Sequence, residues 1–154
     1  MVKKLLDYLS FTGRANRQRY WVRALLLAVV GVIAMMLTLG MSDMVPILGI
    51  MGLPAALILM VAILANGARR LHDRNKSAWW LLLFVGLPSI LSTPGQVAKA
   101  SGDQGLMALG ALCALVGLPF SIWGFVEIGC LRGTAGPNRY GEDPLATPIA
   151  EAFA

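Results

Sequence analysis

The residues with the most evident capacity for chemistry lie in one polar stretch, residues 67–80, between two long apolar runs. This stretch holds the only histidine of the chain, His72, directly before Asp73. A metal site normally needs three or more ligands, and no second histidine or cysteine lies nearby in the sequence. A catalytic nucleophile needs an oriented base, and the one hydroxyl close in sequence, that of Ser77, is more simply a helix cap. We therefore expect no catalytic residue, no metal and no cofactor, and we expect that the protein is not an enzyme.

Arginines supply the second kind of chemistry. A guanidinium group can hold a phosphate or a carboxylate through two parallel hydrogen bonds. The candidates for binding an anionic group come from three separate segments and are Arg14, Arg17, Arg69, Arg70, His72, Asn138 and Tyr140. In the other interpretation, the arginines pair with Asp73, Asp143 or tail carbonyls and lock helix ends together. The structural interpretation is favoured, because arginine–carboxylate pairs commonly close helix ends.

Two pairings can be predicted from position alone. Arg69 and Asp73 are spaced i and i+4, so they can pair on a helix. Glu127 lies within the last apolar run, where an ionisable group is costly unless it has a partner. Arg23 is the predicted partner because it lies at a similar depth in the first run, and the competing partners are Arg69 and Arg132.

The elements that must position these residues are membrane helices. Hydrophobic residues make up 57% of the chain and charged residues only 14%, against roughly 25% charged residues in soluble proteins. Four stretches contain no Asp, Glu, Lys or Arg: residues 24–42, 44–68, 77–98 and 104–126. Each is close to the ~20 residues that a helix needs to cross a bilayer. A large soluble core is excluded, because too few polar residues remain to cover its helices.

The expected fold is all-α, a polytopic membrane bundle of four transmembrane helices in one domain, residues 1–154. The expected fold also has three cytosolic parts. They are an N-terminal segment, an ordered loop between the second and third spans, and an ordered tail. The basic residues gather in these three parts, so the positive-inside rule places both termini in the cytosol. The expected bounds are 1–20 for the first segment, about 21–40, 46–65, 79–93 and 105–131 for the spans, and 132–154 for the tail.

Local signals refine the first helix. Thr12 is a reasonable N-cap for a helix that would place Arg14, Arg17 and Trp21 on one face. Aromatic rings collect where a membrane meets water. The expected interface anchors of the first and third spans are Tyr20, Trp21, Trp79 and Trp80.

Further signals concern the other helices and the tail. The second helix is expected to continue past the membrane to Arg74, and a polar loop is expected over residues 95–104. The tail is dense in Gly, Pro, Asn and Asp, which predicts a compact loop anchored by Tyr140 rather than a helix.

The tripeptide Gly-Leu-Pro occurs three times in the expected spans, at residues 52–54, 86–88 and 117–119. Proline inside a helix removes a backbone hydrogen bond and bends the rod. Three bends at similar depth could widen the middle of a bundle and open a path. Prolines are also simply tolerated in membrane helices, and this second interpretation is favoured.

Three motifs together resemble a known family. They are Phe11-Thr-Gly-Arg14 with Arg17 and Tyr20-Trp21, then Arg69-Arg-Leu-His-Asp73 with Ser77-Ala-Trp-Trp80, then Gly136-Pro-Asn-Arg-Tyr-Gly141 with Asp143-Pro144. In order and spacing they resemble the domain of unknown function 805 family of small bacterial inner-membrane proteins. Ala78 departs from the glycine that is usual before the tryptophan pair. The resemblance implies a multi-span membrane domain with these motifs on its inner face, and it implies no reaction.

The expected function is a non-enzymatic binding or scaffold module of the bacterial inner (cytoplasmic) membrane, with a basic cytosolic face. The expected partners are membrane lipids. The basic face is expected to bind an anionic small molecule, a lipid headgroup or a protein. A homo-oligomer is left open, and no nucleic acid is expected. The alternative function is a small transporter or channel component that uses a kinked bundle and Glu127.

Overall fold

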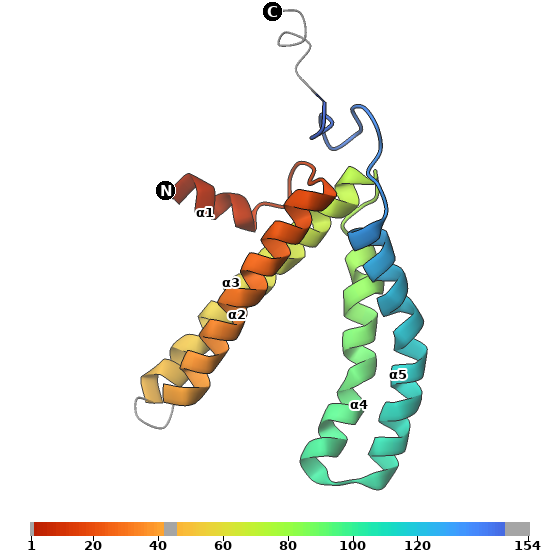
Figure 1. The fold of residues 1–154 in the computed structure, drawn as a ribbon. Coiled ribbons are helices and arrows are strands. Elements are labelled where there is room, and N and C mark those ends of the chain that lie inside the picture. Colours follow the sequence, from red (N-terminus) through yellow and green to blue (C-terminus); the bar gives the residue numbers. More distant parts are fainter. Residues whose placement is uncertain (1, 42–45, 147–154) are drawn as a thin grey trace, which may run out of the picture. The chain divides into compact units, whose positions relative to one another are not determined.

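The structure is a computed structural model that describes residues 2–41 and 46–146 (Figure 1). Within these ranges the regular structure is helical, and the β contacts amount to one isolated bridge between Asn138 and Gly141. The predicted all-α class is confirmed. The chain forms two compact units, which we describe separately. Unit 1 comprises Met1–Asn75 and Arg132–Ala154, and unit 2 comprises Lys76–Leu131.

Unit 1 holds a short amphipathic helix, α1 (Val2–Leu9), and two long helices, α2 (Arg17–Met41) and α3 (Pro46–Asp73). Helices α2 and α3 run side by side as an antiparallel hairpin (Figure 1). Glycines permit their close approach. A Cβ atom on Gly31 would lie 2.8 Å from Leu59 Cδ2, and one on Gly52 would lie 2.7 Å from Thr38 Cγ2.

The start of α2 differs from the prediction. Asn16, and not Thr12, caps this helix, because Asn16 Oδ1 accepts a hydrogen bond of 2.8 Å from the backbone N–H of Arg19. Gly13 has φ +83°, a left-handed conformation that a continuous helix through this position could not contain. Arg14 therefore lies before the helix and shares no helical face with Arg17.

The end of α3 agrees with the prediction that the second helix runs past the apolar run. It continues through the polar residues to Asp73. The chain leaves the helix through Asn75, whose φ of +57° is the left-handed conformation with which many helices end.

Unit 2 is a second helical hairpin. A π-helical turn (Leu82–Gly86) leads into α4 (Leu87–Ser101), and α5 (Gln104–Phe125) leads into another π-helical turn (Val126–Cys130). The predicted polar loop over residues 95–104 is wrong, because helix continues to Ser101. The hydroxyls of Ser92 and Thr93 both bond to the carbonyl of Ser89 within the helix, so these polar residues do not interrupt it.

Three glycines of α5, spaced seven residues apart, are buried and face the helical segment Leu82–Ser101. They are Gly110, Gly117 and Gly124. They lie against Gly95, Leu91 and Phe84 respectively. Small residues let two membrane helices approach closely, and a seven-residue repeat keeps the same face turned to the neighbour. The hairpin is therefore packed backbone against backbone at Gly110.

Three described helical segments are long and apolar enough to cross a membrane: Arg17–Thr38, Gly52–Asp73 and Gln104–Cys130. They overlap the first, second and fourth expected spans, about 21–40, 46–65 and 105–131, without matching their bounds. The segment Leu82–Ser101, which contains most of the third expected span, is not among them, because its α-helical part is only 15 residues long. Pro54 and Pro119 lie inside helices α3 and α5 as expected, whereas Pro88 occupies the first turn of α4.

Candidate functional site

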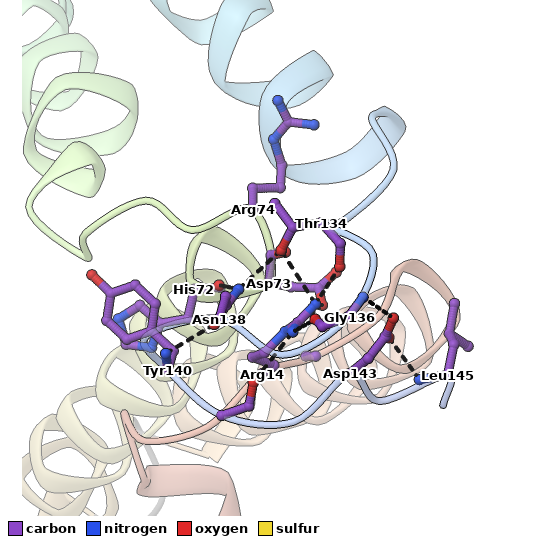
Figure 2. A network of polar contacts seen from close by, with 12 residues as sticks. Arg14, His72, Asp73, Arg74, Thr134, Gly136, Asn138, Tyr140, Asp143 and Leu145 are labelled. Atoms are coloured by element: carbon purple, nitrogen blue, oxygen red, sulfur yellow. Dashed lines mark hydrogen bonds and ion pairs between the residues drawn. The ribbon is translucent and has the colours of Figure 1, made fainter. Parts of the chain in front are cut away.

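The end of α3 is built around a buried carboxylate. Asp73 accepts from Arg14 Nε at 3.1 Å through Oδ1 (Figure 2). Arg70 Nη1 donates to Asp73 Oδ2. The side chains of Asp73, Arg14 and Arg70 are 4%, 1% and 0% exposed. The predicted Arg69–Asp73 pair is wrong, because two other guanidinium groups occupy this carboxylate.

Arg14 also holds the tail. Its Nη atoms donate to the carbonyls of Thr134 at 2.6 Å, Gly136 at 2.7 Å and Gly141 at 3.3 Å. A guanidinium group carries five N–H donors in a fixed fork, which lysine could not imitate. One arginine thus links the chain before α2, the end of α3 and the tail.

The tail in turn satisfies the end of α3. The last carbonyls of a helix have no partner within it. The carbonyl of Asp73 accepts from Thr134 N at 2.8 Å and Thr134 Oγ1 at 3.0 Å, and that of His72 accepts from Asn138 Nδ2 at 2.9 Å. We call Arg14, Arg70, Asp73 and residues 133–143 the α3 cap.

His72 and Tyr140 stack face to face within this region. Their ring centroids are 3.8 Å apart and their planes differ by 6°. His72 Nδ1 also lies 3.3 Å from the carbonyl oxygen of Gly13. Tyr140 thus anchors the tail to the end of α3 by stacking on His72, as predicted. Both rings make contacts within the protein.

Asp143 was a predicted arginine partner, and its carboxylate instead binds backbone N–H groups of the tail. It accepts from Leu145 N at 2.9 Å and Gly136 N at 2.9 Å. These bonds, with a smaller contribution from the charges of Arg14 and Arg132, hold the pKa of Asp143 below its usual value. Asp143 therefore organises the turn that presents the Gly136 carbonyl to Arg14.

A second ion cluster joins α1 to the hairpin of unit 1. Arg23 Nη2 lies 2.6 Å from Asp7 Oδ2, and Arg69 Nη2 lies 2.8 Å from Asp7 Oδ1. We call Asp7, Arg23 and Arg69 the Asp7 triad. Sequence reasoning missed Asp7, although it is the only acidic residue before Asp43 and precedes a strongly basic segment.

The predicted Arg23–Glu127 pair is corrected by these contacts. Arg23 binds Asp7 on a helix of its own unit. Glu127, buried in the π-helical turn after α5, lies 2.9 Å from Lys76 Nζ, which is 4.7 Å from the ring centroid of Trp80. Arg23 therefore meets its partner on α1, and Glu127 meets its partner in the segment before the first π-helical turn, so similar depth was not sufficient to choose the partner.

The Asp7 triad predicts a pH dependence. Hydrogen bonding from Arg69, and then from Arg23, lowers the pKa of Asp7 from 3.8 to about 2. A lowered pKa means that the stabilising contribution is complete above pH ~4 and is lost as the pH falls toward 2. Hydrogen exchange of α1, corrected for intrinsic rates, should accelerate within this window. In Asp7→Asn the amides of α1 should exchange fast at every pH in this window. If exchange in that variant accelerated with falling pH as much as in the wild type, the assignment to Asp7 would be contradicted.

The expected interface anchors differ in their surroundings. Trp21 and Trp79 are 44% and 76% exposed. Tyr20 is half-buried and lies edge-on to Trp21. Trp80 packs on Phe84 and Trp123 within unit 2. In the sequence, each of the two exposed indoles lies where a polar stretch gives way to an apolar run.

A polar cavity of about 230 Å³ adjoins the α3 cap. The start of α2, the end of α3 and the tail form its walls. Its charged lining residues are Arg17, Asp73, Arg132 and Asp143. Among the described residues no three His, Cys, Asp or Glu side chains come together as a metal site would require. The other expected anion ligands Arg14, Arg69 and Arg70 bind internal acceptors, so Arg17 is the one that reaches this cavity.

Comparison with known proteins identifies close relatives in sequence. Residues 8–142 match the family model described as "Protein of unknown function (DUF805)". Inner membrane protein YhaI of Escherichia coli (strain K12) is 31% identical over 141 residues, which cover 91% of this chain and 90% of the relative. Inner membrane protein YhaH of the same strain is 28% identical over 152 residues, covering 96% and 97%. No solved structure matches the chain.

Proposed function

The chain belongs to the DUF805 family, a family of unknown function with inner-membrane members, and from this premise we propose that it is a non-enzymatic membrane module that binds a small anionic group beside the α3 cap. The buried ion pairs and hydrogen bonds of the cap give it a fixed shape. The polar cavity against it is the binding site.

The proposal includes a topology of four spans with both termini in the cytosol. Leu82–Ser101 supplies the third span, since it lies antiparallel to α5 within unit 2. Twenty helical residues extend ~30 Å, the thickness of the hydrocarbon core. The basic residues near Arg17, Arg70 and Arg132 then all lie on the cytosolic side, as the positive-inside rule requires.

The observation that carries the proposal is the charge balance around the polar cavity. Arg14, Arg17, Arg70 and Arg132 surround two carboxylates, those of Asp73 and Asp143. Asp73 already binds two buried guanidinium groups. The arginines that line the cavity itself are Arg17 and Arg132, which are both exposed. The cavity also lies at the N-terminus of the 25-residue helix α2, where the helix dipole favours an anion.

The volume limits the ligand. A cavity of about 230 Å³ is smaller than the roughly 300–1,000 Å³ of sites for drug-sized molecules. A phosphate group, alone or as part of a lipid headgroup, is of suitable size and charge. A nucleotide would have to leave its base and sugar outside.

The environment of Glu127 bears on the transporter alternative. This carboxylate is 4% exposed and paired with Lys76 beside Trp80. The buried salt bridge, with its ammonium group over the Trp80 ring, supports a structural role of Glu127 in unit 2. We therefore place the binding module before the transporter.

Phosphate binding is testable with the full chain in mild detergent. Inorganic phosphate should raise the unfolding temperature in a saturable manner, and at about 100 times Kd the stabilisation should reach ~2.7 kcal/mol. Glycerol 3-phosphate, a headgroup fragment, should do the same at lower concentration if the natural ligand is a lipid. The double variant Arg17→Gln, Arg132→Gln should lose the effect.

Two controls separate binding from a general salt effect. Chloride at equal ionic strength should give no saturable shift. Arg19 is an exposed arginine at the same end of α2 and does not line the cavity, so Arg19→Gln should respond to phosphate like the wild type. A response that survives in the Arg17 and Arg132 double variant would refute the site.

A further inference from the structure

A separate apolar groove lies in unit 1 between α1 and the α2–α3 hairpin. Its volume is about 590 Å³. Helix α1 contributes Leu6 and Leu9, α2 contributes Val30, and α3 contributes Ala55 and Ala62. It does not adjoin the polar cavity, with which it shares no lining residue.

The groove continues along the hairpin. A second apolar cavity of about 450 Å³ shares Val30, Ala55 and Leu59 with the first and reaches Gly52. From Gly52 to Ala62, ten helical steps of ~1.5 Å each, α3 spans ~15 Å. This is half of the ~30 Å hydrocarbon core, which is the depth of one leaflet.

One end of this groove is charged. Leu6 and Tyr8, which line it, flank Asp7 in the sequence, and the Arg23 guanidinium lies 5.1 Å from the Tyr8 ring centroid. Within the Asp7 triad, the Asp7 carboxylate is 48% exposed and the Arg23 side chain 14%. The groove therefore begins beside an accessible carboxylate and a guanidinium group, and continues over side chains that are apolar except for Thr38.

We propose that this groove holds one acyl chain of an amine-bearing phospholipid, with the ammonium of the headgroup at Asp7 and its phosphate at Arg23. The charges of both signs complement a zwitterionic headgroup, and the apolar length matches one leaflet. A helix of a second copy fits less well. A 15 Å length of helix about 10 Å wide fills ~1,200 Å³, more than the two cavities of about 590 and 450 Å³ along that length hold together.

The experiment uses the full chain reconstituted in vesicles that contain phosphatidylethanolamine and phosphatidylglycerol, then extracted in mild detergent for native mass spectrometry. The wild type should retain one phosphatidylethanolamine per chain. Ala55→Phe fills the groove at an exposed position and should reduce retention about tenfold, the consequence of losing the burial of roughly two methylene groups. Ala28→Phe, the same change at an exposed position of α2 outside the groove, should retain lipid like the wild type.

A second variant tests the headgroup. Asp7→Asn removes the partner of the ammonium and should abolish the preference for phosphatidylethanolamine over phosphatidylglycerol. Circular dichroism should show wild-type helicity in Ala55→Phe and Ala28→Phe. Equal lipid loss in Ala55→Phe and Ala28→Phe would overturn the proposal. A lipid-free dimer that Ala55→Phe dissociates would also overturn it, and would assign the groove to a second copy.

Discussion

Asp73→Asn should lower the free energy of unfolding of unit 1 by about 3–5 kcal/mol, the cost of breaking a buried ion pair by removing one partner. The reason is that Asp73 compensates two guanidinium groups, those of Arg14 and Arg70, which are 1% and 0% exposed. Asparagine is nearly isosteric, so the loss would report the charge and not a cavity. The backbone carbonyl of residue 73 would still accept from Thr134.

Two measurements separate this effect from a general loss of folding. Equilibrium unfolding in mixed micelles gives the free energy, and trypsin cleavage after Arg132 and Arg139 reports release of the tail. In Asp73→Asn the free energy of unfolding should fall and trypsin cleavage of the tail should become faster. Asp103→Asn is the matched control, because Asp103 is an exposed N-cap of α5 and asparagine caps a helix about as well. Wild-type trypsin resistance in Asp73→Asn would contradict the role given to this pair.

Gly110→Ala should produce the second large effect, a loss of about 1–3 kcal/mol or more from the packing of α4 on α5. A Cβ atom at this position would lie 2.5 Å from Gly95 Cα and 2.6 Å from Gly95 N. Both are backbone atoms, so no side-chain rotation can relieve the clash. The two helices would have to move apart along the glycine seam.

Gly117→Ala supplies the control on the same face of the same helix. Its Cβ atom would come no closer than 3.5 Å to any neighbour, and the nearest is Leu91 Cδ1. Alanine is favoured over glycine in a helix by ~1 kcal/mol, so this variant should be neutral or more stable than wild type. Equilibrium unfolding in mixed micelles measures the free energy of unfolding of both variants. Equal destabilisation by the two changes would show that the seam is not packed as described.

The sequence was sufficient for the general class of the protein. Long uncharged stretches predict membrane helices, because transfer into a bilayer depends on a sum over neighbouring residues and needs no knowledge of the fold. The three motifs around Arg14, Asp73 and Tyr140 also predicted, through their family resemblance, which segments would matter. The predicted continuation of the second helix past its apolar run agrees with α3, which extends to Asp73.

The partners of the charged side chains depended on the tertiary structure. Asp73 binds Arg14, which lies 59 positions earlier in the chain. On α3 it binds Arg70, three positions before it, and not Arg69, four positions before it. Helical spacing makes both neighbours available, and only the path of the chain before α2 decides which one is turned toward the cap. The left-handed Gly13 sets that path.

For Arg23 and Glu127, depth in the apolar runs indicated that each needs a partner, and did so correctly. It could not reveal that Asp7, on a short helix folded against the hairpin, would reach Arg23, or that Lys76 would reach Glu127. The energy of an ion pair depends on a separation of a few ångströms between atoms, whereas sequence position defines depth only to about one helical turn. Hydropathy therefore determined where the helices lie, and the packed backbone determined which charges meet.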